Sequence, residues 1–336
     1  MIARTPTRVE APGWQRELRE GFSSVEELLR FLDLRTEDLS GAIAAARDFQ
    51  LRVPRSFAAR MRRGDPRDPL LLQVLPRGEE RDAVPGFRRD PLGEEAESPV
   101  PGLLRKYRGR ALWIVTGACA VHCRYCFRRH FPYDEHQDWS RGWPDAIRHL
   151  EEDPSVEEVI LSGGDPLTVP DERLSALAAR LDAIPHVRRL RIHTRWPVVL
   201  PSRVDARLLD WLEATRLATV VVLHANHAAE LDSEVAGAVS RLRSTGAVLL
   251  NQSVLLRGVN DSVEALEALS RRLFAIGVLP YYLHLLDPVA GAAHFEVPEP
   301  AARQLWSGLS DRLPGYLVPR LAREVPGEGA KRVLGR

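Results

Sequence analysis

The sequence predicts an α/β fold, an open and partial (β/α)6 TIM-like barrel with an N-terminal helical arm and a short C-terminal extension. Two observations lead to this prediction. From Ala111 onward, six short apolar runs alternate with amphipathic segments, which is the pattern of a parallel sheet with helices outside it. Six such units are too few to close a barrel of eight strands, so we expect an open one.

The predicted strands are short runs rich in apolar and β-branched residues, at 111–117, 158–164, 189–194, 219–226, 248–256 and 279–286. Segments with helical apolar spacing lie between them, at 143–152, 171–183, 206–214, 230–244 and 262–276. Active sites of such barrels lie where the carboxyl ends of the strands meet. We expect the barrel over residues 106–297. The extension, 298–336, should contain one more helix and then a Gly-rich end.

Residues 1–105 differ in pattern from the rest of the chain. Helical apolar spacing occurs at 14–31 and 40–46, and Ser24 followed by Glu27 resembles a capping box. Stretches rich in Pro, Gly and Arg follow, and residues of these types interrupt regular structure. The pattern therefore predicts a helical arm and then an extended strap that leads into the barrel.

The composition argues against several classes of function. The 336 residues include 47 basic and 46 acidic side chains, and a net charge of +1 gives no long-range attraction to nucleic acid or to a membrane. The first twenty residues lack the apolar core of a signal peptide. The longest apolar runs are far too short to span a bilayer. We expect a soluble, cytoplasmic protein, and the sequence leaves its oligomeric state open, a homo-oligomer included.

All three cysteines lie on the loop that follows the first predicted strand. Cys119, Cys123 and Cys126 have the spacing C-x3-C-x2-C. A closed zinc site takes four ligands and an ordinary four-iron cluster takes four cysteines, but the chain has no fourth cysteine. A [4Fe-4S] cluster held by three thiolates leaves one iron open to S-adenosylmethionine (SAM), and this spacing resembles the signature of radical SAM enzymes. A zinc site completed by His122 or His130 is the alternative.

Polar residues also end the later strands. Ser162, Gly163, Gly164 and Asp165 form either a plain tight turn or a turn whose backbone groups and carboxylate grip the SAM ammonium. The following strands end near polar side chains, namely His193, His224, Asn251, His284 and Asp287. One such residue would be a satisfied core group, whereas a series of them predicts one pocket. Arg128 and Arg129 are surface charges or a clamp for a carboxylate.

The chain as a whole resembles the lysine 2,3-aminomutase family, whose members use radical SAM chemistry and pyridoxal 5'-phosphate (PLP). It is most similar to the bacterial branch that makes (R)-β-lysine for the modification of elongation factor P. The motifs that carry the resemblance cover nearly the whole chain. They are LRVPRSF, DPLLLQVLP, CAVHCRYCFRRHFPY, SGGDPL, LLNQSVLLRGVND, PYYLHLLD followed by GAAHF, and GYLVPRLARE.

The resemblance implies an isomerase that converts L-lysine to β-lysine. Its electron donor would be a flavodoxin or ferredoxin, and a separate ligase would transfer the product to elongation factor P. The implied cluster ligands are Cys119, Cys123 and Cys126. The implied SAM-binding residues are Ser162, Gly163, Gly164, Asp165 and Gln252. The implied PLP-binding residues are Tyr107 and Arg110, near the phosphate, and Lys331, which would form the Schiff base.

Two further residues would bind the substrate, Arg128 its carboxylate and Asp287 its distal ammonium. The chain departs from the family after Lys331, where the common Thr-Pro is Arg-Val, and at Glu324, where longer relatives have a second aspartate. Those relatives also carry C-terminal cysteines for zinc; this chain has none left, so no zinc is expected. Lys331 is one of only two lysines, which hints at amine chemistry, although a lysine near a C-terminus is usually a solvated charge.

Two alternatives to this function stay open at the level of sequence. One is a radical SAM enzyme that has lost PLP or that acts on another amino acid, such as glutamate or arginine. The other is a non-catalytic iron–sulfur or zinc module.

Overall fold

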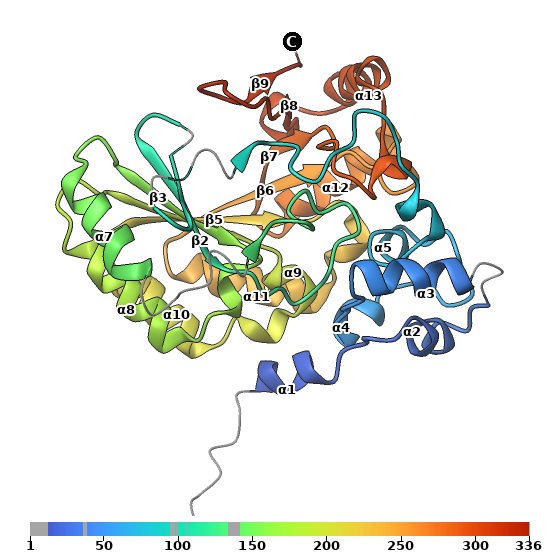
Figure 1. The fold of residues 1–336 in the computed structure, drawn as a ribbon, viewed down its shortest axis with the longest axis horizontal. Helices are drawn as coiled ribbons and strands as arrows, with labels where there is room; N and C mark the ends of the chain where they lie inside the picture. The colour runs from blue at the N-terminus through green and yellow to red at the C-terminus, as the bar shows by residue number, and fades with distance from the viewer. Residues whose placement is uncertain are drawn as a thin grey trace, which may run out of the picture.

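One nine-stranded sheet organises the molecule, with its strands in chain order from β1 to β9 (Figure 1). It is seen in a computed structural model that describes residues 13–35, 39–94, 98, 100–105, 107–133 and 142–335. The strands from β2 to β8 are mutually parallel, whereas the short β1 and β9 pair antiparallel at the two edges. The predicted open barrel is confirmed, with a seventh parallel strand added.

All six predicted strands are present. They are β2 (Arg110–Thr116), β3 (Glu158–Gly163), β4 (Arg189–Thr194), β5 (Ala218–His224), β6 (Val248–Val254) and β7 (Leu279–His284). Three short strands were not predicted, namely β1 (Leu103–Leu104), β8 (Arg320–Arg323) and β9 (Arg332–Val333). The expected Gly-rich end therefore contains two of them. Strands of two to four residues are too short for an alternating pattern to stand out.

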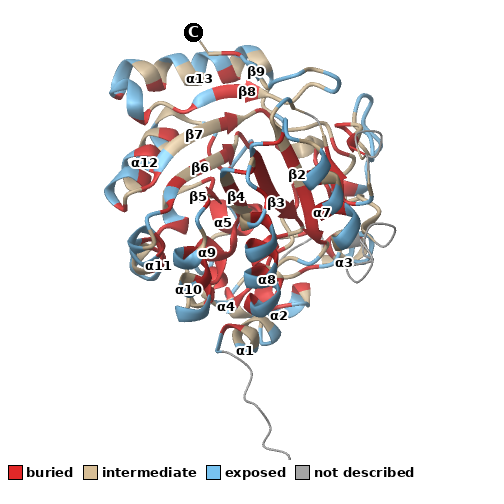
Figure 2. Ribbon diagram, turned by 90° about the vertical axis from the view of Figure 1, so that its left-hand side faces the viewer, coloured by how far each residue is buried: buried red, intermediate tan, exposed pale blue. Residues whose placement is uncertain are grey.

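Helices cover the outer side of the sheet, with their exposed residues facing away from it (Figure 2). They are α7 (Gly142–Glu152), α8 (Asp171–Asp182), α10 (Ala206–Ala214), α11 (Ser233–Ser244), α12 (Val263–Ala275) and α13 (Glu299–Arg312). Side-chain caps fix where several of them begin, because Asp205, Asp232 and Ser262 each accept a hydrogen bond from a first-turn N–H.

The N-terminal arm consists of short helices, α1 (Gly13–Arg19), α2 (Val25–Phe31), α3 (Leu39–Asp48), α4 (Arg55–Ala58) and α5 (Pro69–Leu72). The helical spacing predicted at 14–31 is divided between α1 and α2, because Phe22 pairs with Val53 in an antiparallel bridge, with Phe22 N 2.8 Å from Val53 O. Ser24 caps α2 by accepting from Glu27 N, which is one of the two hydrogen bonds of the predicted capping box.

The arm and the barrel share one hydrophobic core. Trp14 of α1 packs edge-to-face on Trp196, with ring centroids 5.1 Å apart, and both belong to the same buried cluster as the strands. A second cluster joins α12 and α13 to β7 and β8 through Leu266, Leu309 and Leu321. The division of the chain after residues 105 and 297 stays a prediction. Among the described residues, no helix combines the length and the apolar character that crossing a bilayer requires.

Two glycines let the end of β3 approach the end of β2. Gly163 has φ +129°, and a Cβ there would overlap the Thr116 carbonyl oxygen. A Cβ on Gly164 would overlap the carbonyl oxygens of Gly117 and Ala118. Because these neighbours are backbone atoms, a side chain could be accommodated only by separating the strand ends. The tight turn at this point is therefore a steric requirement of the fold.

We predict that Gly163→Ala lowers the free energy of unfolding by about 3 kcal/mol or more, since it combines overlap with strained backbone. Chemical denaturation monitored by circular dichroism would measure the change. Gly237→Ala is a matched control within α11, where a Cβ meets nothing closer than Arg241 Nη1 at 3.6 Å. That change should be neutral or stabilising by up to about 1 kcal/mol. Equal effects of the two changes would contradict the prediction.

Candidate active site

The cysteine loop lies at the carboxyl end of β2 and is held there by the N-terminal arm. Backbone hydrogen bonds join His122 N to Arg52 O at 3.0 Å and Arg124 N to Gln73 O at 2.9 Å. Arg52 Nη1 also donates to Cys119 O at 3.2 Å. The arm thus fixes the backbone of the loop that carries the three thiols.

The three thiols are free and lie within electrostatic reach of one another. Burial raises the pKa of Cys119, and the neighbouring Cys126 raises it further. Burial and Cys123 raise the pKa of Cys126 to about 11. Thiolates this close repel one another, so the thiolate form is favoured only when metal cations balance their negative charges. Three partly buried thiols on one loop therefore fit a cluster that supplies several iron ions.

The described residues include no group of three His, Cys, Asp or Glu side chains that converges on a single metal ion. A four-iron cluster takes each thiolate on a different iron, so it needs no common point. The two histidines considered as zinc ligands contact backbone carbonyls. His122 Nδ1 lies 2.8 Å from Gln50 O, and His130 Nε2 lies 3.0 Å from Ala290 O.

Asp165, predicted to bind SAM, uses both carboxylate oxygens inside the protein. Oδ1 accepts from Leu167 N at 3.1 Å and from Thr194 Oγ1 at 2.7 Å, and Oδ2 accepts from Arg195 N at 2.6 Å. Burial raises the pKa of Asp165 to about 7, although these donors act in the opposite direction. The carboxylate therefore joins the ends of β3 and β4, a role that the sequence did not indicate. A role in SAM binding stays a prediction.

Arg128, predicted to clamp the substrate carboxylate, is paired with a carboxylate from the strap. Its Nε and Nη2 donate to Glu94 at 2.6 and 2.8 Å, and its Nη1 donates to Ser162 Oγ at 2.9 Å. The guanidinium is buried, and Glu94 raises the pKa of Arg128 despite that burial. The bidentate pair fixes the plane of the guanidinium. Sequence reasoning missed Glu94.

The residues predicted to bind PLP come together around Glu324. The Lys331 ammonium forms an ion pair with one oxygen of this carboxylate, and the Tyr107 hydroxyl donates to the other. The Arg110 guanidinium lies 4.9 Å from the centre of the Tyr107 ring. A primary amine, a phenol and a cation in one place fit the aldehyde and phosphate of PLP. Glu324, where longer relatives have a second aspartate, here engages Lys331 and Tyr107 through its two oxygens.

The C-terminal segment returns to the sheet, and this brings Lys331 to the barrel. β9 pairs with β8 through Ala322 and Val333, immediately beyond the lysine. Lys331 Nζ lies 5.9 Å from the ring centre of Tyr282 on β7. The lysine is therefore partly buried, with 26% of its side chain exposed, and it is not the solvated charge that its position in the chain alone would suggest.

The pKa values of two half-buried histidines show which charged groups lie near one another inside the barrel. Burial lowers the pKa of His193, and Arg191, Lys331 and Arg128 lower it further. Burial lowers the pKa of His284 to about 3, and Lys331 adds to the shift. Lys331 and Arg128, more than two hundred residues apart in the chain, thus act on the same histidine. Both histidines are held neutral at physiological pH.

The remaining predicted residues lie on β6 and after β7. Gln252 pairs in register with His224 on β5 and with Tyr282 on β7, so it lies at the same edge of the sheet as the other strand ends. Asp287 is half-buried and follows β7, and its backbone oxygen accepts from Val289 N at 2.7 Å. The assigned contacts of Gln252 with SAM and of Asp287 with substrate stay predictions.

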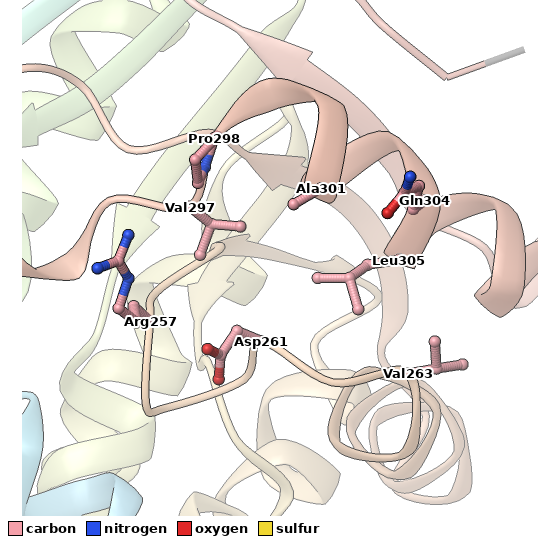
Figure 3. Close-up of a pocket in the computed structure, with 8 residues that line it drawn as sticks. All are labelled: Arg257, Asp261, Val263, Val297, Pro298, Ala301, Gln304 and Leu305. Carbon is pink, nitrogen blue, oxygen red and sulfur yellow. The ribbon is translucent and has the colours of Figure 1, made fainter.

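A separate surface pocket of about 470 Å³ lies between the loop after β6 and the start of α13 (Figure 3). Val297, Pro298 and Leu305 make apolar walls, and Arg257 and Asp261 are its charged residues. None of the predicted site residues lines it. The chemistry that the sequence predicts therefore belongs to the barrel edge and not to this pocket.

Comparison with known proteins identifies the class of protein to which this fold and site belong. The model of the Radical SAM superfamily matches residues 113–269, which begin within β2 and end within α12. This match identifies the barrel with its cysteine loop as that of a radical SAM protein.

Full-length relatives narrow the class. L-lysine 2,3-aminomutase of Escherichia coli is 49% identical over 98% of this chain and 96% of its own length. The enzyme of that name from Haemophilus influenzae is 46% identical, over 98% of each chain. That from Clostridium subterminale is 35% identical over 95% of this chain and 76% of its own. The chain belongs to the lysine 2,3-aminomutase family.

We predict that replacing Cys119, Cys123 or Cys126 by Ala prevents assembly of a [4Fe-4S] cluster, since the chain has no other thiolate to take its place. Iron and sulfide content after anaerobic reconstitution would measure the loss. His122→Ala and His130→Ala are controls, and both should retain iron. Stoichiometric zinc without iron in the anaerobically purified protein would favour the zinc alternative.

Proposed function

We propose that this protein is a radical SAM, PLP-dependent isomerase that converts L-lysine to β-lysine. The observation that carries the proposal is the return of the C-terminal segment, which brings Lys331 beside Tyr107 and Arg110. Relatives named for this reaction match the chain over nearly its full length. The proposal includes a [4Fe-4S] cluster and SAM bound near the three cysteines, and PLP bound at Lys331.

The cofactors and the protein residues divide the chemistry between them. When bound, the cluster, SAM and PLP supply a carbon-centred radical and a conjugated group that stabilises the migrating nitrogen. The protein must bind lysine in one orientation and exclude water from the radical. Arg128 offers a fixed, buried guanidinium for the carboxylate, and Asp287 offers an acid for the distal ammonium. A charge at each end of the substrate would select its length.

Glu324 is in direct contact with the amine of Lys331. A lysine amine reacts with a carbonyl only in its neutral form. Because Glu324 accepts from Lys331, a proton that leaves Nζ has an acceptor in direct contact. Burial and Glu324 raise the pKa of Tyr107, so this phenol stays protonated and continues to donate to the same carboxylate. The three groups thus form one proton-holding unit at the predicted PLP site.

We further propose that the reaction takes place in the cytoplasm with a flavodoxin or ferredoxin as electron donor. The product would pass to a ligase that modifies elongation factor P. The support is the set of motifs shared with that bacterial branch and the close match in length to the E. coli relative.

We predict that Lys331→Arg abolishes PLP retention and turnover, because a guanidinium keeps the positive charge but offers no reactive amine. The visible absorbance of bound PLP after desalting would measure retention. SAM binding and iron content should be unchanged, which separates this effect from misfolding.

Borohydride reduction followed by peptide mapping tests the same assignment in the wild-type protein. The label is expected on Lys331. A label on Lys106, which lies outside the described residues, would contradict it.

We predict that the reconstituted protein with SAM, PLP and dithionite converts L-lysine to β-lysine faster than it converts glutamate or arginine. Asp287→Asn should raise the KM for lysine by about ten- to a hundredfold, the loss of one charge-assisted hydrogen bond of about 1.5–3 kcal/mol. Chiral product analysis under anaerobic conditions would measure both results.

The substrate assignment has its own controls. The Asp287→Asn variant should keep its iron and PLP, since the change is isosteric. Faster turnover of glutamate than of lysine would contradict the assignment of substrate. Unchanged modification of elongation factor P in cells that lack the gene would contradict the proposed use of the product.

A further inference from the structure

The sulfur of Cys123 has a charged hydrogen-bond donor beside it. Arg195 follows β4 and precedes the short helix α9 (Trp196–Val199), and its Nη1 lies 2.7 Å from Cys123 Sγ. Only 6% of the arginine is exposed. The Tyr125 side chain also hydrogen-bonds this sulfur. Among the described residues, Arg195 is the one cationic side chain that donates a hydrogen bond to a cysteine sulfur, so Cys123 differs from Cys119 and Cys126 in its surroundings.

A buried polar network fixes the position of this guanidinium. Nη1 also donates to Tyr125 Oη at 2.6 Å, and Nη2 donates to Gln73 Oε1 at 2.7 Å and to Glu230 Oε2 at 3.0 Å. Glu230 is itself fully buried and accepts from Asn226 N at 2.8 Å. With acceptors on both terminal nitrogens, the guanidinium cannot rotate away from the sulfur without breaking several of these bonds.

The free-energy cost of burying these charged groups indicates a function at the sulfur. Replacing a buried ion pair by well-packed apolar residues is often neutral or stabilising, so such a pair is weak evidence for stability. A second buried pair, Arg203 with Asp171 at 2.8 Å, provides a contrast. The other described hydrogen bonds of Arg203 go to the backbone carbonyls of Leu167 and Val169. Arg195 is the arginine whose N–H is directed at a predicted cluster ligand.

We propose that Arg195 donates an N–H···S hydrogen bond to the Cys123 thiolate of the cluster and thereby raises the reduction potential of that cluster. The inference rests on the proposed function, because it requires the cluster. Arg195 acts here through Cys123 and is a positioning residue, not a catalytic one. Hydrogen bonds to cluster sulfurs and nearby charge are established determinants of cluster potential.

The physical reason is the charge that the cluster gains on reduction. The [4Fe-4S] cluster passes from the 2+ to the 1+ state by taking one electron from a one-electron donor, and part of the added charge lies on the thiolate sulfurs. A cationic donor at hydrogen-bond distance stabilises the reduced state more than the oxidised state. The proton stays on the guanidinium, which is not deprotonated in proteins. Glu230 opposes the effect, because its negative charge disfavours the added electron.

The test is an anaerobic redox titration of the reconstituted protein with dithionite and mediators, monitored by electron paramagnetic resonance, without lysine. Arg195→Gln should lower the midpoint potential. At the wild-type midpoint, the ratio of reduced to oxidised cluster should fall about tenfold, which is about 59 mV for a one-electron couple. Glu230→Gln should shift the midpoint in the opposite direction. A general loss of packing would not produce opposite shifts.

Further variants keep the test decisive if Arg195→Gln does not fold. The double variant with Arg195→Gln and Glu230→Gln removes both charges together, so no unpaired charge is buried. It should still have a lower midpoint than the wild type, because the N–H···S bond is lost. Arg195→Lys, which keeps the charge, should lie between the wild type and Arg195→Gln. Arg203→Gln with Asp171→Asn is the matched control, and its midpoint should not shift.

Two results would overturn the inference. One is an intact cluster with an unshifted midpoint in Arg195→Gln or, where that variant does not fold, in the double variant. The other is a shift of the same sign in Arg195→Gln and Glu230→Gln. Failure of the wild-type protein to take up a cluster would overturn the proposed function as well, so the two failures are distinguishable.

Discussion

The buried carboxylate of Glu80 is the constraint on which the position of the cysteine loop depends. It accepts from Arg124 Nε at 2.8 Å and from Arg129 Nη2 at 2.7 Å, and both arginines belong to the loop. Arg124 is fully buried and also donates to Phe49 O at 2.7 Å. Loss of the carboxylate would leave two buried cations without their partner, at a cost of about 3–5 kcal/mol. The arm and the cluster loop are therefore one structural unit.

The strand ends were predictable because the signal for them is local. Six apolar runs, each followed by polar residues, define a parallel sheet and the edge at which its functional groups meet. The spacing of Cys119, Cys123 and Cys126 is equally local. The motifs that the chain shares with lysine 2,3-aminomutases then added assignments that no single pattern carried, such as Tyr107 and Arg110.

The partners of the charged groups were not predictable, because each depends on a contact distant in sequence. Glu94 stands in an acid-rich strap beside Glu95 and Glu97, and nothing local distinguishes the one that pairs with Arg128. Asp165 was predicted as a SAM-binding carboxylate, and nothing in the sequence indicated the three donors that engage it from the end of β4 and from its own turn.

The short strands β8 and β9 were not predicted, for a related reason. Their hydrogen bonds are made by very few residues, among them Leu334 N to Leu321 O at 2.8 Å. In such short strands, pairing with the existing sheet matters more than the intrinsic preference of the residues.

Several charged side chains of the barrel form pairs of one cation with one carboxylate. Arg128 is matched by Glu94, Arg195 by Glu230 and Lys331 by Glu324. On β4, Arg191 is matched by Glu158 of β3 at 2.7 Å. These four pairs add no net charge, and the interior histidines His193 and His284 are held neutral.

A zwitterionic substrate that enters such an interior must exchange partners with these pairs, because each of their cations already has a carboxylate. Its own carboxylate competes with Glu94 for Arg128, and its amines compete with Lys331 for acidic partners. Such exchange keeps charge balanced only where the group displaced from each pair gains a substrate charge as its new partner, because an unpaired buried ion is costly. Selectivity then depends on which substrate charges find a partner at both ends. A second carboxylate would need an additional cation, whereas an additional ammonium needs only an acid, the role proposed for Asp287.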